Sequence, residues 1–143
     1  MRLTTLEPSL EEYRKKLGKL EALTDKPTHY CQGCEHGELT RLIASAIENL
    51  GIRDRTVMVD SVECSVHSFD YFNIDHIQSP HGRAPAIATG LKRVRPDLAV
   101  YTVQGDGDTL AIGLLEVMYA AIRGESISVF LVNNAIYGMT GGQ

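Results

Sequence analysis

The stretch that decides the fold runs from Leu98 to Asp108 and reads LAVYTVQGDGD. Its first part, Leu98 to Val103, is mostly apolar and rich in strand-forming residues, which predicts a strand buried on both faces. Its second part, Gly105-Asp106-Gly107-Asp108, is typical of a loop that leaves the carboxyl end of such a strand. Apolar residues then recur at helical spacing from Leu110 to Ile122, before Gly124. The order strand, acidic glycine loop, helix is therefore expected here.

The same alternation extends in both directions along the chain. Further strands are expected over residues 56–60 and 127–132, and further helices over residues 39–50 and 84–94. A polar loop is expected to reach His81-Gly82. Buried strands that alternate with helices predict an α/β fold with a doubly wound parallel sheet, covered by helices on both faces.

Length and composition favour a single globular domain. The chain has 143 residues, of which 43% are hydrophobic and 22% charged, as in ordinary globular proteins. The formal charge of −4 gives no basic footprint for nucleic acid or an anionic membrane, and no apolar run is long enough for a membrane span. Because residues 1–8 lack the features of a secretory signal, we expect a cytoplasmic protein.

The chain is expected to consist of an N-terminal arm and one domain. Residues 1–28 are interpreted as an N-terminal helical arm, with Leu10, Leu17 and Leu20 as its main apolar positions, serving either as a contact arm for a partner or as a solvated helix. Residues 29–143 form the main domain. Because a sheet seldom ends directly after a strand and a glycine-containing loop, we expect this domain to be truncated at its C-terminal end.

Two loops carry oxygen ligands suited to a metal-bound diphosphate. Asp106 follows one predicted strand and Asn134 follows the next, so both are expected at the carboxyl edge of the sheet. Mg²⁺ prefers oxygen ligands, here the Asp106 carboxylate, the Asn134 amide and a backbone carbonyl near Ile136. Gly105 and Gly107 would let the backbone approach the phosphates closely.

The spacing of these loops adds to the argument. Gly105-Asp106-Gly107 is followed by 25 residues, Asp108 to Val132, and then by Asn133-Asn134. This pattern resembles the thiamine-diphosphate motif of transketolases, decarboxylases and 2-oxo acid oxidoreductases. The alternative is two unrelated loops, since Gly-Asp-Gly alone usually marks only a turn.

The three cysteines leave several possibilities open. Cys31 and Cys34 form a C-x-x-C motif, and Cys64 precedes His67 by three residues. Spacing alone allows a Cys₃His zinc site, an iron–sulfur cluster, a redox dithiol or unligated cysteines.

A second resemblance covers residues 28–143. Tyr30 to Gly37, Ser61 to Ser65, His81 to Ala84 and Asn133 to Gln143 are similar to the β subunit of 2-oxo acid:ferredoxin oxidoreductases, closest to the 2-oxoisovalerate or 2-oxoglutarate type. The resemblance implies a 4Fe–4S cluster held by Cys31, Cys34 and Cys64, with the fourth ligand beyond Gln143. The cofactor-binding residues that we expect from it are His36, Cys64, Gly105, Asp106, Gly107, Asp108, Asn134, Ile136, Gly138 and Met139.

The resemblance also implies an activity and partners. It implies oxidative decarboxylation of a 2-oxo acid to an acyl-coenzyme A, with electrons passed through the cluster to ferredoxin. The glutamate that contacts the aminopyrimidine ring is expected on a partner chain, so α, and also γ or δ, subunits are implied. Glu35 and Glu63 depart from the family, which often has glycine at both positions.

Two other functions are weighed against this one. A non-oxidative thiamine-dependent decarboxylase or synthase would keep the cofactor site without a cluster. A zinc-stabilised binding module would use Cys31, Cys34, Cys64 and His67 for zinc, and its glycine loops would be structural.

Overall fold

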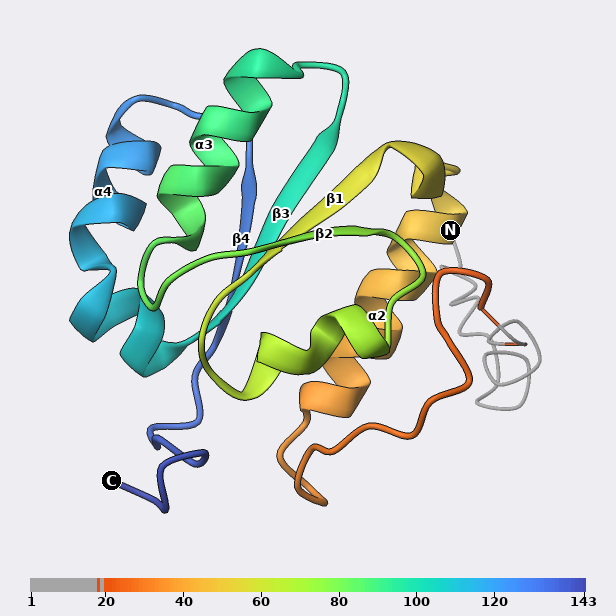
Figure 1. Cartoon of the computed structure of the whole chain (residues 1–143), viewed down its shortest axis with the longest axis vertical. Helices are drawn as coiled ribbons and strands as arrows, with labels where there is room; N and C mark the ends of the chain where they lie inside the picture. Colours follow the sequence, from red (N-terminus) through yellow and green to blue (C-terminus); the bar gives the residue numbers. More distant parts are fainter. Residues whose placement is uncertain (1–17, 19) are drawn as a thin grey trace, which may run out of the picture.

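Four parallel strands form the central sheet of the computed structural model, which describes residue 18 and residues 20–143. The strands are β1 (Thr56–Asp60), β2 (Asp75–Gln78), β3 (Ala99–Gly105) and β4 (Ser128–Val132). They lie in the order β2-β1-β3-β4, so the chain moves to one side of β1 to form β2 and to the other side to form β3. The predicted α/β class with a parallel sheet is confirmed (Figure 1).

Helices cover both faces of this sheet. Helix α2 (His36–Asn49) lies on one face, and α3 (Ala84–Val94) with α4 (Leu114–Ile122) lies on the other (Figure 1). On the α2 face, Ile43 and Ile47 pack with Met58 and Tyr101 of the sheet. On the opposite face, a second core contains Val59, Ala84, Ala88 and Val100. Alternate residues of β1 and β3 therefore face opposite cores, which explains why these strands are apolar throughout.

The region between β1 and α3 is more structured than the sequence indicated. Residues 61–82, predicted as a polar loop, contain a 3₁₀ segment at Cys64–Asp70 and the edge strand β2. Strand β2 reads Asp75-His76-Ile77-Gln78, and its residues alternate too little in polarity to predict a strand. Its pairing with β1 supplies the order that its composition does not.

The third predicted helix is interrupted. Residues Gly107–Ile112 form a π-helical segment, and α4 begins only at Leu114, after Gly113. The first turn after β3 is thus wider than an α-helix, a feature common at functional sites.

Part of the predicted arm packs into the domain. Leu20 and Ala22 are buried in the α2-side core, and Leu23 forms an isolated antiparallel bridge with Phe72. Residues 20–28 contain no helix, so the prediction of a helical arm is wrong for this part. The rest of the arm, including Leu10 and Leu17, lies outside the described residues, and its helical character stays a prediction.

Large apolar side chains remain on the surface of α4 and β4. Leu115, Met118, Tyr119 and Ile122 of α4 are between 47% and 73% exposed, and Phe130 of β4 is 37% exposed. Among the described residues, no helix is long and apolar enough to cross a membrane.

Candidate functional site

The candidate site lies at the carboxyl ends of β1, β3 and β4. Gly105, the last residue of β3, pairs with Val132, the last residue of β4, so the two loops predicted to carry the metal site leave the sheet side by side. Strand order changes direction between β1 and β3, and such switch points are where open α/β sheets bind ligands. The pocket found there is lined by His36, Val62, Glu63, Cys64, His81, Gly105, Asp106, Gly107, Asp108, Asn134, Ile136, Tyr137, Gly138, Met139 and Thr140.

Asp106 joins the two loops directly. Its Oδ1 accepts a hydrogen bond from the Gly107 backbone N–H at 2.8 Å, and its Oδ2 accepts one from the Ala135 N–H at 2.6 Å. The first bond caps the following π-helical segment. The second crosses from the β3 loop to the β4 loop, so a single carboxylate fixes their separation.

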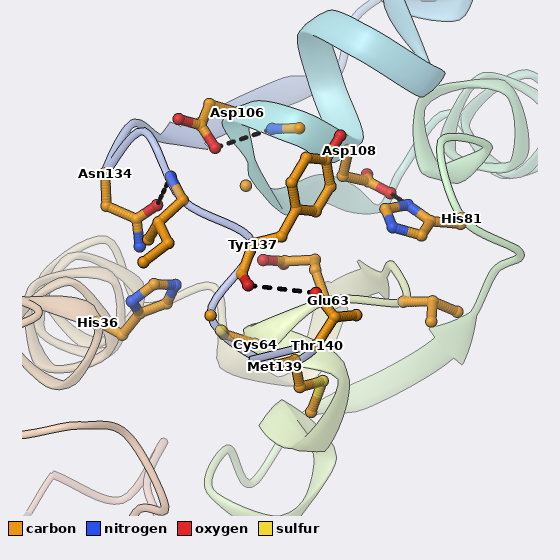
Figure 2. A pocket seen from close by; sticks show the side chains of 15 residues that line it. His36, Glu63, Cys64, His81, Asp106, Asp108, Asn134, Tyr137, Met139 and Thr140 are labelled. Atoms are coloured by element: carbon orange, nitrogen blue, oxygen red, sulfur yellow. Dashed lines mark hydrogen bonds and ion pairs between the residues drawn. The ribbon is translucent and has the colours of Figure 1, made fainter. Parts of the chain in front are cut away.

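Asn134 lies in the same pocket but does not share a hydrogen bond with Asp106 among the interactions of residues 20–143. The Asn134 Oδ1 accepts a bond from the Ile136 N–H at 3.3 Å. In the view of Figure 2 its amide extends to the His36 side of the loop, and the Asp106 carboxylate lies on the other side. The carboxylate of Asp106 and the amide oxygen of Asn134 are ligands of the kind that Mg²⁺ prefers. That both side chains bind the same ion stays a prediction.

Close backbone approach explains the glycines of the first loop. The Tyr137 ring packs on Gly107, where a Cβ atom would collide with the ring. A Cβ on Gly105 would lie 3.0 Å from Glu63 Oε2. The absence of a side chain at Gly105 and Gly107 thus lets Glu63 and Tyr137 pack directly on the loop backbone at the pocket.

His36 is a buried polar group directed into this pocket. It is 3% exposed, and among the described residues neither ring nitrogen makes a hydrogen bond of good geometry. The ring stacks on Tyr30 with 5.0 Å between the centroids. Burial lowers the pKa of the His36 imidazole, which the Cys34 backbone opposes only in part. Because an unpaired buried donor is costly, this residue fits a ligand that accepts a hydrogen bond.

Glu63 places a second carboxylate in the pocket beside Asp106. The Ser65 hydroxyl lies within hydrogen-bond reach of both a Glu63 carboxyl oxygen and the Val103 carbonyl oxygen, the latter at 3.1 Å, and donates its single proton to one of them at a time. Burial, together with the nearby Asp108 charge, raises the Glu63 pKa to about 7. Glu63 was expected only as a departure from a family glycine, and the fold places its side chain in the pocket.

The three cysteines approach one another but are all free thiols. Burial raises the pKa of Cys64, and the charges of Glu63, Cys34 and Cys31 raise it further. Across residues 20–143, however, no group of three or more His, Cys, Asp or Glu side chains is close enough to hold a metal ion. These residues therefore do not by themselves fit a cluster or the Cys₃His zinc site.

Residues 57–143 match the thiamine pyrophosphate enzyme C-terminal TPP binding domain. The chain belongs to the thiamine pyrophosphate enzymes. The matched residues contain the four strands, except for Thr56 at the start of β1, and both loops of the pocket. The part of the chain that resembles other thiamine pyrophosphate enzymes is therefore the part that forms most of the site.

Individual relatives narrow the resemblance. Ketoisovalerate oxidoreductase subunit VorA of Methanothermobacter thermautotrophicus is 53% identical over 116 residues, 81% of this chain and 24% of that protein. The 2-oxoglutarate synthase subunit KorB of Archaeoglobus fulgidus is 38% identical over 117 residues, 82% of this chain and 44% of that protein. The predicted resemblance to subunits of 2-oxo acid:ferredoxin oxidoreductases is confirmed.

A solved structure supports the same relation. It is the 2-oxoglutarate:ferredoxin oxidoreductase from Magnetococcus marinus with 2-oxoglutarate, coenzyme A and succinyl-CoA bound. This thiamine pyrophosphate enzyme chain matches it with a TM-score of 0.81 and 32% identity, over 86% of its own length and 43% of that chain. The chain thus spans between a quarter and a half of the length of these relatives.

Some pocket residues were not predicted as site residues. Val62, Glu63, Tyr137 and Thr140 line the pocket in addition to the ten residues expected there. The sequence offered one indication of their role: they lie close to expected residues, as Glu63 does before Cys64 and Tyr137 before Gly138. His81, which the sequence allowed either as a cofactor contact or as the start of its helix, lines the pocket as well.

Proposed function

We propose that this chain is the part of a 2-oxo acid:ferredoxin oxidoreductase that binds thiamine diphosphate through Mg²⁺. The observation that carries the proposal is the hydrogen bond of 2.6 Å from the Ala135 N–H to Asp106 Oδ2. It joins the two loops of the thiamine motif within one pocket, which also contains a buried histidine whose ring nitrogens are unpaired among the described residues.

The residues of the pocket have distinct tasks in this proposal. Asp106, Asn134 and the backbone carbonyl of Ile136 would hold Mg²⁺, and Gly105 and Gly107 would admit the diphosphate. His36 would donate a hydrogen bond to a phosphate oxygen, which would satisfy its buried ring. When bound, thiamine diphosphate supplies the carbanion chemistry of decarboxylation. Cys64, Gly138 and Met139 would line the remaining wall.

The whole enzyme extends beyond this chain. We infer oxidative decarboxylation of a 2-oxo acid with coenzyme A as the acyl acceptor and ferredoxin as the electron acceptor. The similarity to named subunits supports assembly with α, and also γ or δ, subunits. A 4Fe–4S cluster on Cys31, Cys34 and Cys64 and a cytoplasmic location stay predictions for the full protein. A zinc module and a non-oxidative decarboxylase are less well supported by these relatives.

Calorimetry tests the cofactor site. Thiamine diphosphate titrated into the purified protein should bind in the presence of Mg²⁺ and lose most of its affinity in EDTA. Asp106→Ala should abolish the Mg²⁺-dependent binding. Because Asp106 also links the loops, Asp106→Asn, which keeps an acceptor oxygen but not the charge, should likewise weaken binding.

A surface variant serves as the control for this titration. Asp97 pairs with Arg95 on the surface, just before β3 and thus at the opposite edge of the sheet from the pocket. Asp97→Asn should bind the cofactor like the parent protein. Magnesium-dependent binding of parental strength by both Asp106 variants would remove the proposed metal role.

A further inference from the structure

His81 stands on the pocket wall in a rigidly held loop. The next residue, Gly82, has a φ of 77°, a conformation that side-chain-bearing residues rarely adopt. A Cβ on Gly82 would lie 2.6 Å from Ile112 Cγ2 and 2.9 Å from the Gly113 nitrogen. The loop before α3 is thus pressed against the end of the π-helical segment, which fixes the backbone of His81.

The side chain of Asp108 holds the His81 ring. Asp108 is 1% exposed, and its Oδ1 accepts hydrogen bonds from Ser61 Oγ at 2.8 Å, from the Gly82 N–H at 2.6 Å and from His81 Nδ1. Its Oδ2 accepts a fourth from Gln104 Nε2 at 2.5 Å. The donors follow β1, precede α3 and lie on β3, so one buried carboxylate ties together three walls of the site.

The hydrogen bonds to Asp108 give it a different role from Asp106, the other acidic residue of the Gly-Asp-Gly-Asp loop. Asp106 bridges to the β4 loop, whereas both oxygens of Asp108 are occupied by donors of the chain itself. Asp108 therefore acts on a ligand through His81 rather than by direct contact. Because Nδ1 of His81 is committed to Asp108, the nitrogen left for a ligand is Nε2.

Comparison with a second histidine–carboxylate pair shows what is particular to His81. His76 Nδ1 lies 2.8 Å from Asp60 Oδ2, but the His76 side chain is only 10% exposed and its Nε2 is buried outside the pocket. The His81 side chain is 32% exposed and lines the pocket. In Figure 2 its ring stands beside Asp108 at the pocket wall, opposite His36.

We propose that His81, oriented by Asp108, donates a hydrogen bond through Nε2 to an anionic oxygen of the ligand in this pocket. This inference rests on the proposed function and adds a ligand-contacting residue to it. The oxygen belongs either to the diphosphate of the cofactor or to the carboxylate of the 2-oxo acid. The carboxylate at Nδ1 and an anionic oxygen at Nε2 are both acceptors, so each ring nitrogen has an acceptor to which it can donate. Asp108 is a positioning residue in this arrangement.

A pair of isosteric substitutions tests the role of Nε2. In His81→Asn the amide nitrogen replaces Nδ1 and keeps the link to Asp108, but nothing replaces Nε2. In His81→Gln the amide nitrogen replaces Nε2, and the link to Asp108 is lost. A purely structural histidine would tolerate His81→Asn better than His81→Gln, whereas the proposal predicts that His81→Asn loses ligand affinity while its thermal unfolding stays close to that of the parent.

Two measurements separate the sources of the oxygen. Calorimetry gives the Kd of thiamine diphosphate with Mg²⁺, and steady-state kinetics of the assembled oxidoreductase at saturating cofactor give KM and kcat for the 2-oxo acid. A rise of about tenfold or more in Kd assigns the contact to the diphosphate, and a comparable loss in kcat/KM at unchanged Kd assigns it to the substrate. Asp97→Asn is the matched surface control.

The outcomes distinguish this inference from the function on which it rests. If the parent protein binds the cofactor and His81→Asn shows parental Kd, KM and kcat, the role of His81 is overturned and the proposed function stands. If the parent protein itself fails to bind thiamine diphosphate with Mg²⁺, both fall.

Discussion

Glu35 adopts a backbone conformation that favours glycine. Its φ is 61° and its ψ is −4°, directly before α2, and its side chain makes no capping hydrogen bond. The left-handed region costs a residue with a Cβ atom roughly 1–2 kcal/mol. The replacement of a family glycine by Glu35 therefore acts first of all on the backbone.

Glu35→Gly should raise the free energy of unfolding. We expect a gain of about 0.5–1 kcal/mol, since relief of the strained φ outweighs the greater freedom of glycine in the unfolded chain. Urea unfolding measures it. Gly33, with a φ of 81° and no atom within 4 Å of an added Cβ, offers the reverse control. Gly33→Ala should lose stability, and a loss for Glu35→Gly as well would contradict the argument.

Glu63 makes stability depend on pH. Burial raises its pKa from 4.5 to about 7, so the folded protein holds this proton more tightly than the unfolded chain does. The resulting stabilisation is complete below about pH 4.5 and is lost as the pH rises through about 7.

Glu63→Gln should remove the pH dependence of stability that the Glu63 carboxyl group causes. Between pH 5 and pH 8 the free energy of unfolding of the parent should fall by on the order of 2–3 kcal/mol relative to Glu63→Gln. The difference between the two proteins is the relevant quantity, because His36, whose pKa is lowered by burial, contributes a pH dependence of opposite sign. Parallel curves for the two proteins would show that Glu63 does not titrate in this range.

At the scale of elements, the break between the π-helical segment and α4 is set by packing rather than by helix propensity. Gly113 lies at this junction, and a Cβ there would come within 2.5 Å of the Gly82 carbonyl oxygen and 2.8 Å of the Asp108 carbonyl oxygen. The helix following β3 thus approaches the loop that carries His81 as closely as backbones permit.

Gly113→Ala should therefore destabilise the protein, although alanine is the better helix former. We expect a loss of about 2 kcal/mol or more from overpacking. Gly90 of α3, where an added Cβ meets nothing within 4 Å, is the matched control, and Gly90→Ala should gain up to about 1 kcal/mol. Thermal unfolding compares them, and a gain in both variants would refute the close contact.

For the whole molecule, the surface suggests that the chain works as part of a larger assembly. Leu115, Met118, Tyr119 and Ile122 of α4 are exposed, and exposed apolar surface of this kind marks interaction sites. The resemblance places the glutamate that contacts the aminopyrimidine ring on a partner chain.

The isolated chain should accordingly bind thiamine diphosphate but not turn over a 2-oxo acid. Reconstitution with the other subunits should restore reduction of ferredoxin or a viologen dye. Turnover by the chain alone, at a rate similar to that of the assembly, would show that the catalytic groups are all present here.

Local sequence patterns were sufficient to predict the α/β class, the helices at residues 39–50 and 84–94, and the strands that are themselves apolar runs. Periodicity and the Gly-Asp-Gly to Asn spacing depend only on local order along the chain, so they were visible without coordinates. The tertiary structure alone decided the strand β2, the π-helical turn, the entry of Glu63 into the pocket and the different tasks of Asp106 and Asp108. The physical reason is that each depends on groups that are distant in sequence, such as the Ser61 and Gly82 donors at Asp108, which only folding brings together.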